Sequence, residues 1–199
     1  MSVRPALILT RRQWLSALLG AAALAMYRPT AAESRPATLQ GQVLDIHDGD
    51  SLTLRSEEGR KWRIRIAGID APELSQPAGD TARALLVELI RNRSLRIAPV
   101  KTDAYERTVA KVWVLGLEGP EMDVGLALIE AGLAWHFVRY RADQPPEDVQ
   151  RYAQAEKRAR AQRFGIWQQA RPEAPWDHRA RMRREESGST LRSKREPPS

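Results

Sequence analysis

Alternating apolar and polar positions mark the first part of the chain. Residues 61–66 read KWRIRI, so apolar and basic side chains fall on opposite faces of a strand. Two shorter apolar runs precede this segment, at 43–44 and 51–54, and the turn dipeptides Asp48-Gly49 and Glu58-Gly59 separate the three. This order predicts three consecutive strands in an antiparallel meander.

The apolar period changes to that of a helix after the meander. Apolar residues between 82 and 89 recur at i, i+3, i+4 and i+7, and Asp80 precedes them as a candidate N-cap. Beyond this helix the pattern predicts strands at 95–97 and 108–115, a short helix from about Asp123 to Gly132, and a helix from Pro145 to Gly165. Five strands with three helices predict an α+β, mainly β, fold: a five-stranded OB-fold barrel with three packed helices.

The N-terminal segment, residues 1–32, has the composition of an export signal. It carries four arginines and no acidic residue, and residues 14–26 are uncharged. Small residues then offer cleavage after Ala25 or Ala32. The pair Arg11-Arg12 leaves a twin-arginine signal and an ordinary secretory signal as alternatives. We therefore predict a periplasmic or secreted protein, without stable membrane insertion after signal removal, and a monomer.

The C-terminal segment, residues 170–199, predicts a basic, disordered tail. Eight basic and five acidic residues accompany only six apolar ones, too few to offset the entropy of ordering the segment. Docking of Trp176 onto the body and phosphate contact by the 179–184 cluster are the alternatives.

The remaining domain, residues 33–169, is neutral, with 20 basic and 20 acidic residues, so the formal net charge of +7 belongs to the two ends. Phosphate affinity in this domain must come from local arginines and not from a global field. The absence of cysteine excludes a disulfide scaffold and a cysteine-ligated zinc site.

Acidic residues gather where the predicted strands end. Asp50 follows the first tight turn, and Asp70 and Glu73 lie on a loop that Pro72 stiffens. Carboxylates that meet in this way need a cation, and oxygen ligands alone select a hard metal such as Ca²⁺ or Mg²⁺. For any one of these acidic residues taken alone, the alternative interpretation is that it only ends a strand at a turn and binds no metal.

Two arginines flank this acidic cluster. Arg65 lies on the polar face of its strand, five residues before Asp70, and Arg107 stands at the start of a later strand. A guanidinium keeps its charge and offers a planar fork to phosphate oxygens. Metal carboxylates beside fixed arginines suit a phosphodiester, whose reaction gathers negative charge on its equatorial oxygens.

The order and spacing of five sequence blocks resemble the staphylococcal nuclease (thermonuclease) family. The blocks are DGDS at 48–51, RIAGIDAPE at 65–73, DAYER at 103–107, AGLAW at 131–135 and GIW at 165–167. The likeness covers roughly residues 38–169. It implies an OB-fold barrel with three helices and Ca²⁺-dependent endonucleolytic cleavage of DNA and RNA at the 5′ P–O bond, leaving 3′-phosphate ends.

The resemblance also implies roles for individual residues. Asp50 and Asp70 would supply carboxylates to the metal, and Ala71 its backbone carbonyl. Glu73 would be the general base or orient the attacking water. Arg65 and Arg107 would bind the phosphate and stabilise the transition state. Tyr105 and Tyr140 would line the phosphate and nucleotide pocket.

The sequence departs from the family pattern at a few positions. Glu106 replaces a glycine, and a non-glycine residue at positive φ costs of order 1 kcal/mol or more. Its charge is also expected to tether Arg107 away from phosphate. Val138 stands at a position that is aromatic in the founding member, which weakens the nucleotide pocket.

A non-catalytic OB-fold module that binds nucleic acid or a protein is the alternative function. Exposed aromatic residues could stack bases in such a module. Versions of this barrel that only bind their ligand lack the acids and arginines of the site. All five of these residues are present here: Asp50, Asp70, Glu73, Arg65 and Arg107. The sequence therefore favours the enzyme, a metal-dependent phosphodiesterase.

Overall fold

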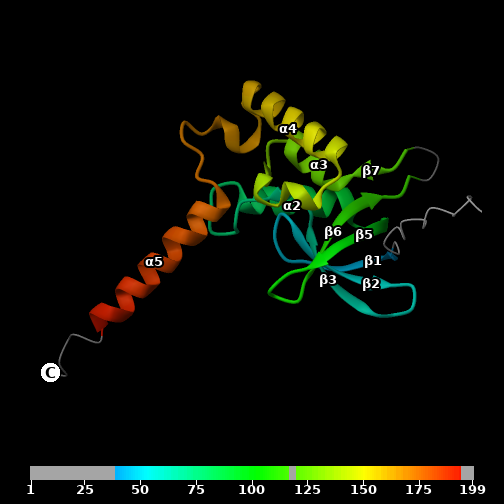
Figure 1. Ribbon diagram of the computed structural model, residues 1–199, viewed down its shortest axis with the longest axis horizontal. Helices are drawn as coiled ribbons and strands as arrows, with labels where there is room; N and C mark the ends of the chain where they lie inside the picture. Colours follow the sequence, from blue (N-terminus) through cyan, green and yellow to red (C-terminus); the bar gives the residue numbers. More distant parts are fainter. Residues whose placement is uncertain (1–38, 117–119, 194–199) are drawn as a thin grey trace, which may run out of the picture. The chain divides into compact units, whose positions relative to one another are not determined.

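Strands form most of the first half of the described chain and helices most of the second (Figure 1). The computed structural model describes residues 39–116 and 120–193, with side chains up to residue 188. All of these residues belong to one unit, Pro36–Ser199. The predicted export signal lies outside the described residues.

Five strands close into a barrel. They are β1 (Leu39–Ile46), β2 (Ser51–Ser56), β3 (Lys61–Ile66), β5 (Ser94–Thr102) and β6 (Thr108–Val114). Antiparallel pairing runs β3-β2-β1-β5-β6, and a parallel pairing of β3 with β6 joins the two ends of this row. Such a closed Greek-key arrangement is that of the OB fold, so the predicted fold class is confirmed.

The strand alternation sets the core. Ile64 and Ile66 of β3 are fully buried, whereas the basic residues between and before them are not. Inward-facing aliphatic residues from every strand meet those of α2 (Gly79–Ile90) and α3 (Val124–Glu130) in one cluster, and α4 (Pro146–Ala161) adds Tyr152 to it. These three helices lie together on one side of the strands (Figure 1).

Short elements complete the region around the acidic loop. β4 (Ile69–Asp70) pairs with β8 (Trp135–His136) in a separate two-stranded ladder. The others are β7 (Met122–Asp123), which pairs with β6, and the 3₁₀ turns η1 (Val138–Asp143) and η2 (Gly165–Gln168). Because β4 is tied to β8, the chain around Asp70 is held by the C-terminal half of the domain.

Two predicted helix boundaries were wrong. Asp80 lies in the first turn of α2, and Ala78, with a φ of 70°, occupies the cap position without a side-chain hydrogen bond. The third helix ends at Ala161 and not at Gly165, which opens η2 with a φ of 50°. The helix predicted from Asp123 is confirmed: the Asp123 side chain accepts the hydrogen bond of the Leu126 amide, and Gly132, at a φ of 68°, follows the last turn.

The C-terminal segment differs from the disordered tail expected from its composition. Residues Pro175–Ser193 form a helix, α5. Trp176 packs against Phe137 and Trp135, with ring centroids 5.5 and 6.4 Å apart, which confirms the alternative that it docks. A few contacts of this kind order a segment that has too little apolar surface to order itself. No described helix is long and apolar enough to cross a membrane.

Candidate active site

The turn between β1 and β2 directs Asp50 inward. The carboxylate of Asp48 accepts hydrogen bonds from the backbone amides of Asp50 and Ser51, at 2.9 and 2.7 Å, so it holds the turn. Asp50 itself is 5% exposed. Gly49 is required here, because a Cβ atom would come within 2.7 Å of the Ala71 side chain. The turn thus packs directly on the loop that carries Asp70.

Arg65 joins the two aspartates. Its guanidinium lies 3.0 Å from Oδ2 of Asp50 and 2.7 Å from Oδ1 of Asp70. It also donates to the backbone carbonyls of Ile66 and Ile69. The amide of Ala71 donates to Oδ2 of Asp50 at 2.8 Å, which links the turn and the loop directly. The structure therefore brings Asp50, Arg65, Asp70 and Ala71 together, as the sequence suggested, but Arg65 is engaged with carboxylates in this state.

Glu73 lies on the loop that follows β4. The amide of Glu73 donates to the Gln76 side chain at 2.9 Å, and the Gln76 amide donates back to the Glu73 carbonyl at 2.8 Å. The Gln76 side chain in turn donates to the carbonyl of Glu173. The Glu73 carboxylate is one-third exposed and points at α5. A fixed backbone with an accessible carboxylate suits a group that exchanges protons.

Arg107 also lines the cavity and is held by Asp103. Oδ2 of Asp103 accepts from the Arg107 guanidinium at 2.8 Å, and Oδ1 accepts from the amides of Tyr105 and Arg107. Burial would raise the pKa of Asp103, but these hydrogen bonds together lower the pKa below its ordinary value. The side chain that tethers Arg107 is therefore Asp103, and the prediction that Glu106 does so was wrong.

Glu106 does adopt the strained conformation expected of it. Its φ is 60°, in the region that glycine occupies without penalty. The turn that contains it presents Tyr105, which is 71% exposed, beside Arg107. Tyr140, in η1, is also exposed and lies under the Lys101 ammonium at 4.0 Å.

One cavity of about 820 Å³ connects all these groups. Its walls come from the β1–β2 turn, β3, the β4 loop, the 103–107 turn, η1 and the start of α5. Each side chain predicted for the site lines it, namely Asp50, Arg65, Asp70, Glu73, Tyr105, Arg107 and Tyr140, together with Ala71. Arg63, Arg139, Arg179 and Arg183 line it too, and the lining as a whole holds seven basic and six acidic side chains.

The second arginine at the carboxylates of Asp50, Asp70 and Glu73 is Arg179, from α5. Its guanidinium lies 2.7 Å from Oδ2 of Asp70 and 2.6 Å from Oε1 of Glu73. The sequence predicts a solvated tail here and does not predict this contact, which joins residues 109 positions apart. A local signal was nevertheless present, because Pro175 followed by an acidic residue in the first turn is typical of a helix start.

Burial dominates the electrostatics of Asp50. It raises the pKa of Asp50 to about 8; Arg65 opposes the shift, and the neighbouring Asp48 and Asp70 add to it. A cation bound to this carboxylate would favour its ionised form.

Guanidinium groups lie between the carboxylates of the cavity. Within the described residues, no three His, Cys, Asp or Glu side chains gather into a cluster that could hold a metal ion. The donors implied for a metal are two aspartates and a backbone carbonyl, and the arginines now pair with the aspartates.

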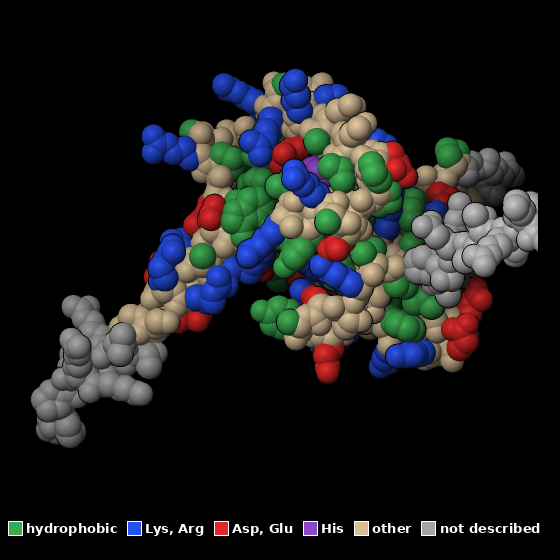
Figure 2. All heavy atoms as spheres, viewed as in Figure 1, with side chains coloured by type: hydrophobic (Ala, Val, Ile, Leu, Met, Phe, Trp, Pro, Cys, Tyr) green, Lys and Arg blue, Asp and Glu red, His purple; other side chains and the backbone are tan. Residues whose placement is uncertain are grey.

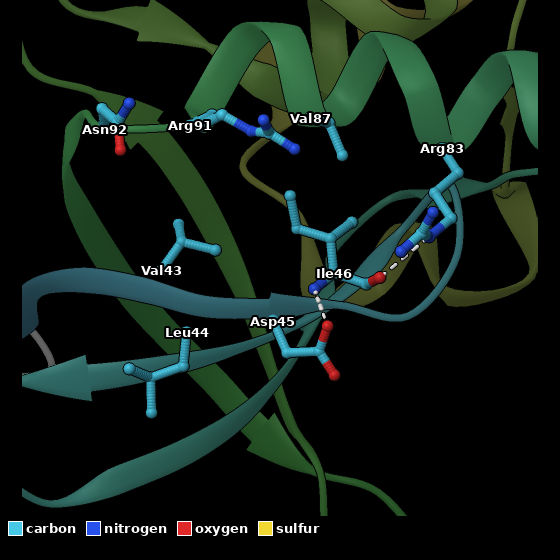
Figure 3. Close-up of a pocket in the computed structure, with 8 residues that line it drawn as sticks. All are labelled: Val43, Leu44, Asp45, Ile46, Arg83, Val87, Arg91 and Asn92. Atoms are coloured by element: carbon cyan, nitrogen blue, oxygen red, sulfur yellow. Dashed lines mark hydrogen bonds between the residues drawn. The ribbon is translucent and has the colours of Figure 1, made fainter.

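A second cavity, of about 190 Å³, lies between the end of β1 and α2 (Figure 3). Arg83 donates to the carbonyl of Ile46 at 2.9 Å there, which ties the helix to the strand. Its lining includes only one acidic residue, Asp45. The chemistry therefore concentrates in the larger cavity.

Comparison with known proteins agrees with this geometry. A family model described as "Staphylococcal nuclease homologue" matches residues 63–169, more than half of the chain. This chain belongs to the staphylococcal nuclease homologue family. The matched segment carries Arg65, Asp70, Glu73 and Arg107, and it begins after the turn that holds Asp50.

Individual relatives of this nuclease homologue come from bacteria and plants. It is 33% identical over 147 residues to the "Micrococcal nuclease" of Shigella flexneri, covering 72% of this chain and 82% of that protein. It is 32% identical over 173 residues to "Protein ParB" of Escherichia coli, covering 85% and 94%.

A plant relative is longer. The identity to "Probable staphylococcal-like nuclease CAN1" of Oryza sativa subsp. japonica is 34% over 143 residues, which covers 71% of this chain and 40% of that protein. A second rice relative, CAN2, is covered over 31% of its length. The chain thus spans less than half the length of these two plant relatives.

Proposed function

We propose that this protein is a metal-dependent endonuclease that hydrolyses phosphodiester bonds of DNA, RNA or both. The observation that carries the proposal is the Arg65 guanidinium held between the buried carboxylates of Asp50 and Asp70, in one cavity with Glu73. Three of the compared proteins have names that call them nucleases, which supports the same activity here.

The residues of the cavity fit a divalent cation, and we infer Ca²⁺, with Mg²⁺ as the alternative. Asp50, Asp70 and the Ala71 carbonyl are oxygen donors, the kind that hard cations select. The position is already adapted to positive charge, because a guanidinium now pairs with Oδ2 of Asp70. When bound, the ion would polarise the phosphoryl group and lower the pKa of a bound water.

The protein side chains would do the rest of the reaction. Glu73, a carboxylate of the cavity that is one-third exposed, would accept the proton of the attacking water. Arg65 and Arg107 would donate to the phosphate oxygens as negative charge grows on them. Arg107 would reach the phosphate from its place beside Asp103, and Tyr105 and Tyr140 would flank the nucleotide.

We also infer export to the periplasm or the medium. Residues 1–32 carry the basic, apolar and small-residue regions of a signal in the expected order. Mass determination of the N-terminus of the protein recovered outside the cytoplasm, with cleavage after Ala25 or Ala32, is the corresponding check.

A cleavage assay with matched variants tests the proposed function. The purified protein is incubated with single- and double-stranded DNA and RNA, in Ca²⁺, in Mg²⁺ or in a chelator. We expect cleavage with Ca²⁺, loss of cleavage with the chelator, and a drop in kcat of about 10²–10⁴-fold for Glu73→Gln.

Glu57→Gln is the control for this assay, because Glu57 is an exposed acid in the β2–β3 turn, outside the cavity. It should retain the wild-type rate. Cleavage that persists in the chelator would contradict the metal, and a wild-type rate for Glu73→Gln would contradict its role. Binding without cleavage of any of the four substrates would favour the non-catalytic module instead.

A further inference from the structure

Both oxygens of Asp70 are covered by arginines. Arg65 lies 2.7 Å from Oδ1, and Arg179 lies 2.7 Å from Oδ2. Asp70 has no exposed side-chain surface. A divalent cation that binds this carboxylate therefore competes with the two guanidinium groups, since each oxygen already has a charged partner.

Arg65 is the arginine that stays. Its side chain is only 14% exposed, and beyond the two aspartates it donates to the carbonyls of Ile66 and Ile69 within its own chain segment. Moving it would leave the buried Asp50 carboxylate without its cation and the two carbonyls without this donor, which is strongly unfavourable.

Arg179 is the arginine that can leave. Its side chain is 37% exposed, and its hydrogen bonds and ion pairs within the described residues are with the carboxylates of Asp70 and Glu73. Its release would return the guanidinium to water and to the cavity that it already lines. The free-energy cost of exchanging it is therefore much smaller than that of exchanging Arg65.

The first turns of α5 are anchored independently of Arg179. The His178 ring is 2.8 Å from the Ser75 hydroxyl, and its other nitrogen is 3.1 Å from Glu173. Arg181 donates to both oxygens of Glu173, and Trp176 packs on Phe137. Basic side chains are visible along α5 and next to it on the body (Figure 2). The backbone of Arg179 is thus held at the cavity, and only its side chain has to move.

Resting on the function proposed above, we propose that Arg179 is an exchangeable partner of the active site. Its guanidinium holds Asp70 and Glu73 while no divalent cation is bound. When the cation takes the carboxylates, the guanidinium turns to the substrate phosphate. Arg179 would then be a substrate-binding residue that α5 adds to the arginines of the barrel.

The exchange follows from charge and geometry. A carboxylate oxygen that already accepts from a guanidinium is a poor ligand for a second cation. The apparent affinity for the metal is therefore the intrinsic affinity multiplied by the fraction of molecules in which the guanidinium is not paired. The planar fork of an arginine suits two phosphate oxygens as well as two carboxylates. The substrate phosphate therefore gives Arg179 new acceptors in place of the Asp70 and Glu73 carboxylates that it leaves when the metal binds.

Calcium binding to the full-length protein tests the first half of the exchange. Isothermal titration calorimetry without nucleic acid compares the wild type with Arg179→Gln, which keeps the bulk and removes the charge. We expect about tenfold tighter Ca²⁺ binding by the variant, which corresponds to about 1.4 kcal/mol, because the charge-assisted hydrogen bonds that compete with the cation are removed.

Arg184→Gln is the matched control, because it removes one charge from α5 at a side chain that does not line the cavity. Its Ca²⁺ affinity should equal that of the wild type. An unchanged or weaker affinity in Arg179→Gln overturns the exchange while leaving the proposed nuclease intact. Absence of Ca²⁺ binding in every variant overturns the cation site, and the exchange with it.

Substrate kinetics at saturating Ca²⁺ test the second half. For Arg179→Gln we expect a KM for DNA raised about three- to tenfold, with kcat much less affected, because a phosphate contact made in both the ground and transition states is lost. Arg184→Gln should keep the wild-type KM. An unchanged KM in Arg179→Gln overturns the transfer to phosphate.

Folding of the variants is checked separately. Thermal unfolding midpoints with and without Ca²⁺ should show a larger stabilisation by Ca²⁺ in Arg179→Gln than in the wild type, since binding to the native state is tighter. If Arg179→Gln unfolds below the assay temperature, Arg179→Lys takes its place. A lysine keeps the charge but cannot span both carboxylates, so its Ca²⁺ affinity should fall between those of the wild type and the expected value for glutamine.

Discussion

At the scale of single residues, Glu106 occupies a backbone conformation that suits glycine. Its φ of 60° places it in the left-handed region, where a side chain costs about 1 kcal/mol or more. The strained turn serves to point two amides at Asp103, those of Tyr105 and Arg107. These hydrogen bonds offset the strain.

We expect Glu106→Gly to raise the free energy of unfolding by up to about 1 kcal/mol, because relief of the strain exceeds the added entropy of the unfolded chain. Urea denaturation measures the change. Glu58→Gly, in a turn where the native residue has no positive φ, is the control and should be neutral or destabilising. Equal effects of the two substitutions would show that the strain at Glu106 is negligible.

The residue scale also shows what spacing can predict. Asp50, Arg65 and Asp70 were expected to converge because each lies at the end of a strand of one meander, and strand pairing with a tight turn leaves few other arrangements. The partner of Arg107 was predicted wrongly. Sequence adjacency favoured Glu106, but the turn points that side chain outward and brings Asp103, four residues before Arg107, under the guanidinium.

At the scale of elements, α5 is the part that the sequence did not predict. Composition argued against an ordered segment because few of its residues are apolar. The helix is instead ordered by single contacts of high specificity: Trp176 on Phe137, His178 with Ser75, and Arg179 with Asp70. Such long-range contacts leave no periodic signal in the sequence, whereas the barrel strands and α2 to α4 do.

Glu173 makes the docking of α5 sensitive to acid. Hydrogen bonds from Arg181, and then from His178, lower the pKa of Glu173 from 4.5 to about 2. A carboxylate whose pKa is lower in the folded state contributes stability above pH 4.5. That contribution is lost as the pH falls toward 2, because the unfolded chain then binds more protons.

We therefore expect Glu173→Gln to lower the thermal unfolding midpoint at neutral pH, and the difference from the wild type to shrink between pH 4.5 and 2. The uncharged glutamine does not titrate, so its own pH profile lacks this contribution. Glu185→Gln, which removes a more exposed partner of the same Arg181, should show little difference at any pH. A difference for Glu173→Gln that stays constant over this range would contradict the role of its ionisation.

At the scale of the whole molecule, barrel closure and helix packing place the site. The pairing of β3 with β6 brings Arg65 and the 103–107 turn to one cavity, and the ladder of β4 with β8 ties the acidic loop to the C-terminal half. The closed barrel was predictable from five alternating strands. The apolar packing of the helices on the barrel was predictable too, but a polar link between them was not, because its buried groups have partners that are distant in sequence.

This link is a buried network around Lys111 of β6. Its ammonium pairs with Asp148 of α4 and lies 3.3 Å from Asp123, whose other oxygen accepts from the Tyr152 hydroxyl at 2.8 Å. Both aspartates are almost completely buried, and Lys111 is 16% exposed. The ammonium is therefore what compensates two carboxylates that have left water.

We expect Lys111→Ala to lower the free energy of unfolding by about 3–5 kcal/mol, because it leaves the buried Asp123 without its cation and Asp148 with only the exposed Arg151. Chemical denaturation at pH 7 measures the loss.

Arg151→Ala is the matched control: Arg151 lies 3.4 Å from the same Asp148 but is 52% exposed, so its removal should change stability by no more than about 1 kcal/mol. Similar losses for the two variants would mean that charge near Asp148, and not burial of the network, stabilises the junction. Because Lys111 is not among the residues that line the cavity, a Lys111→Ala protein that remains folded should keep its Ca²⁺ affinity, which separates the stability of the scaffold from the chemistry of the site.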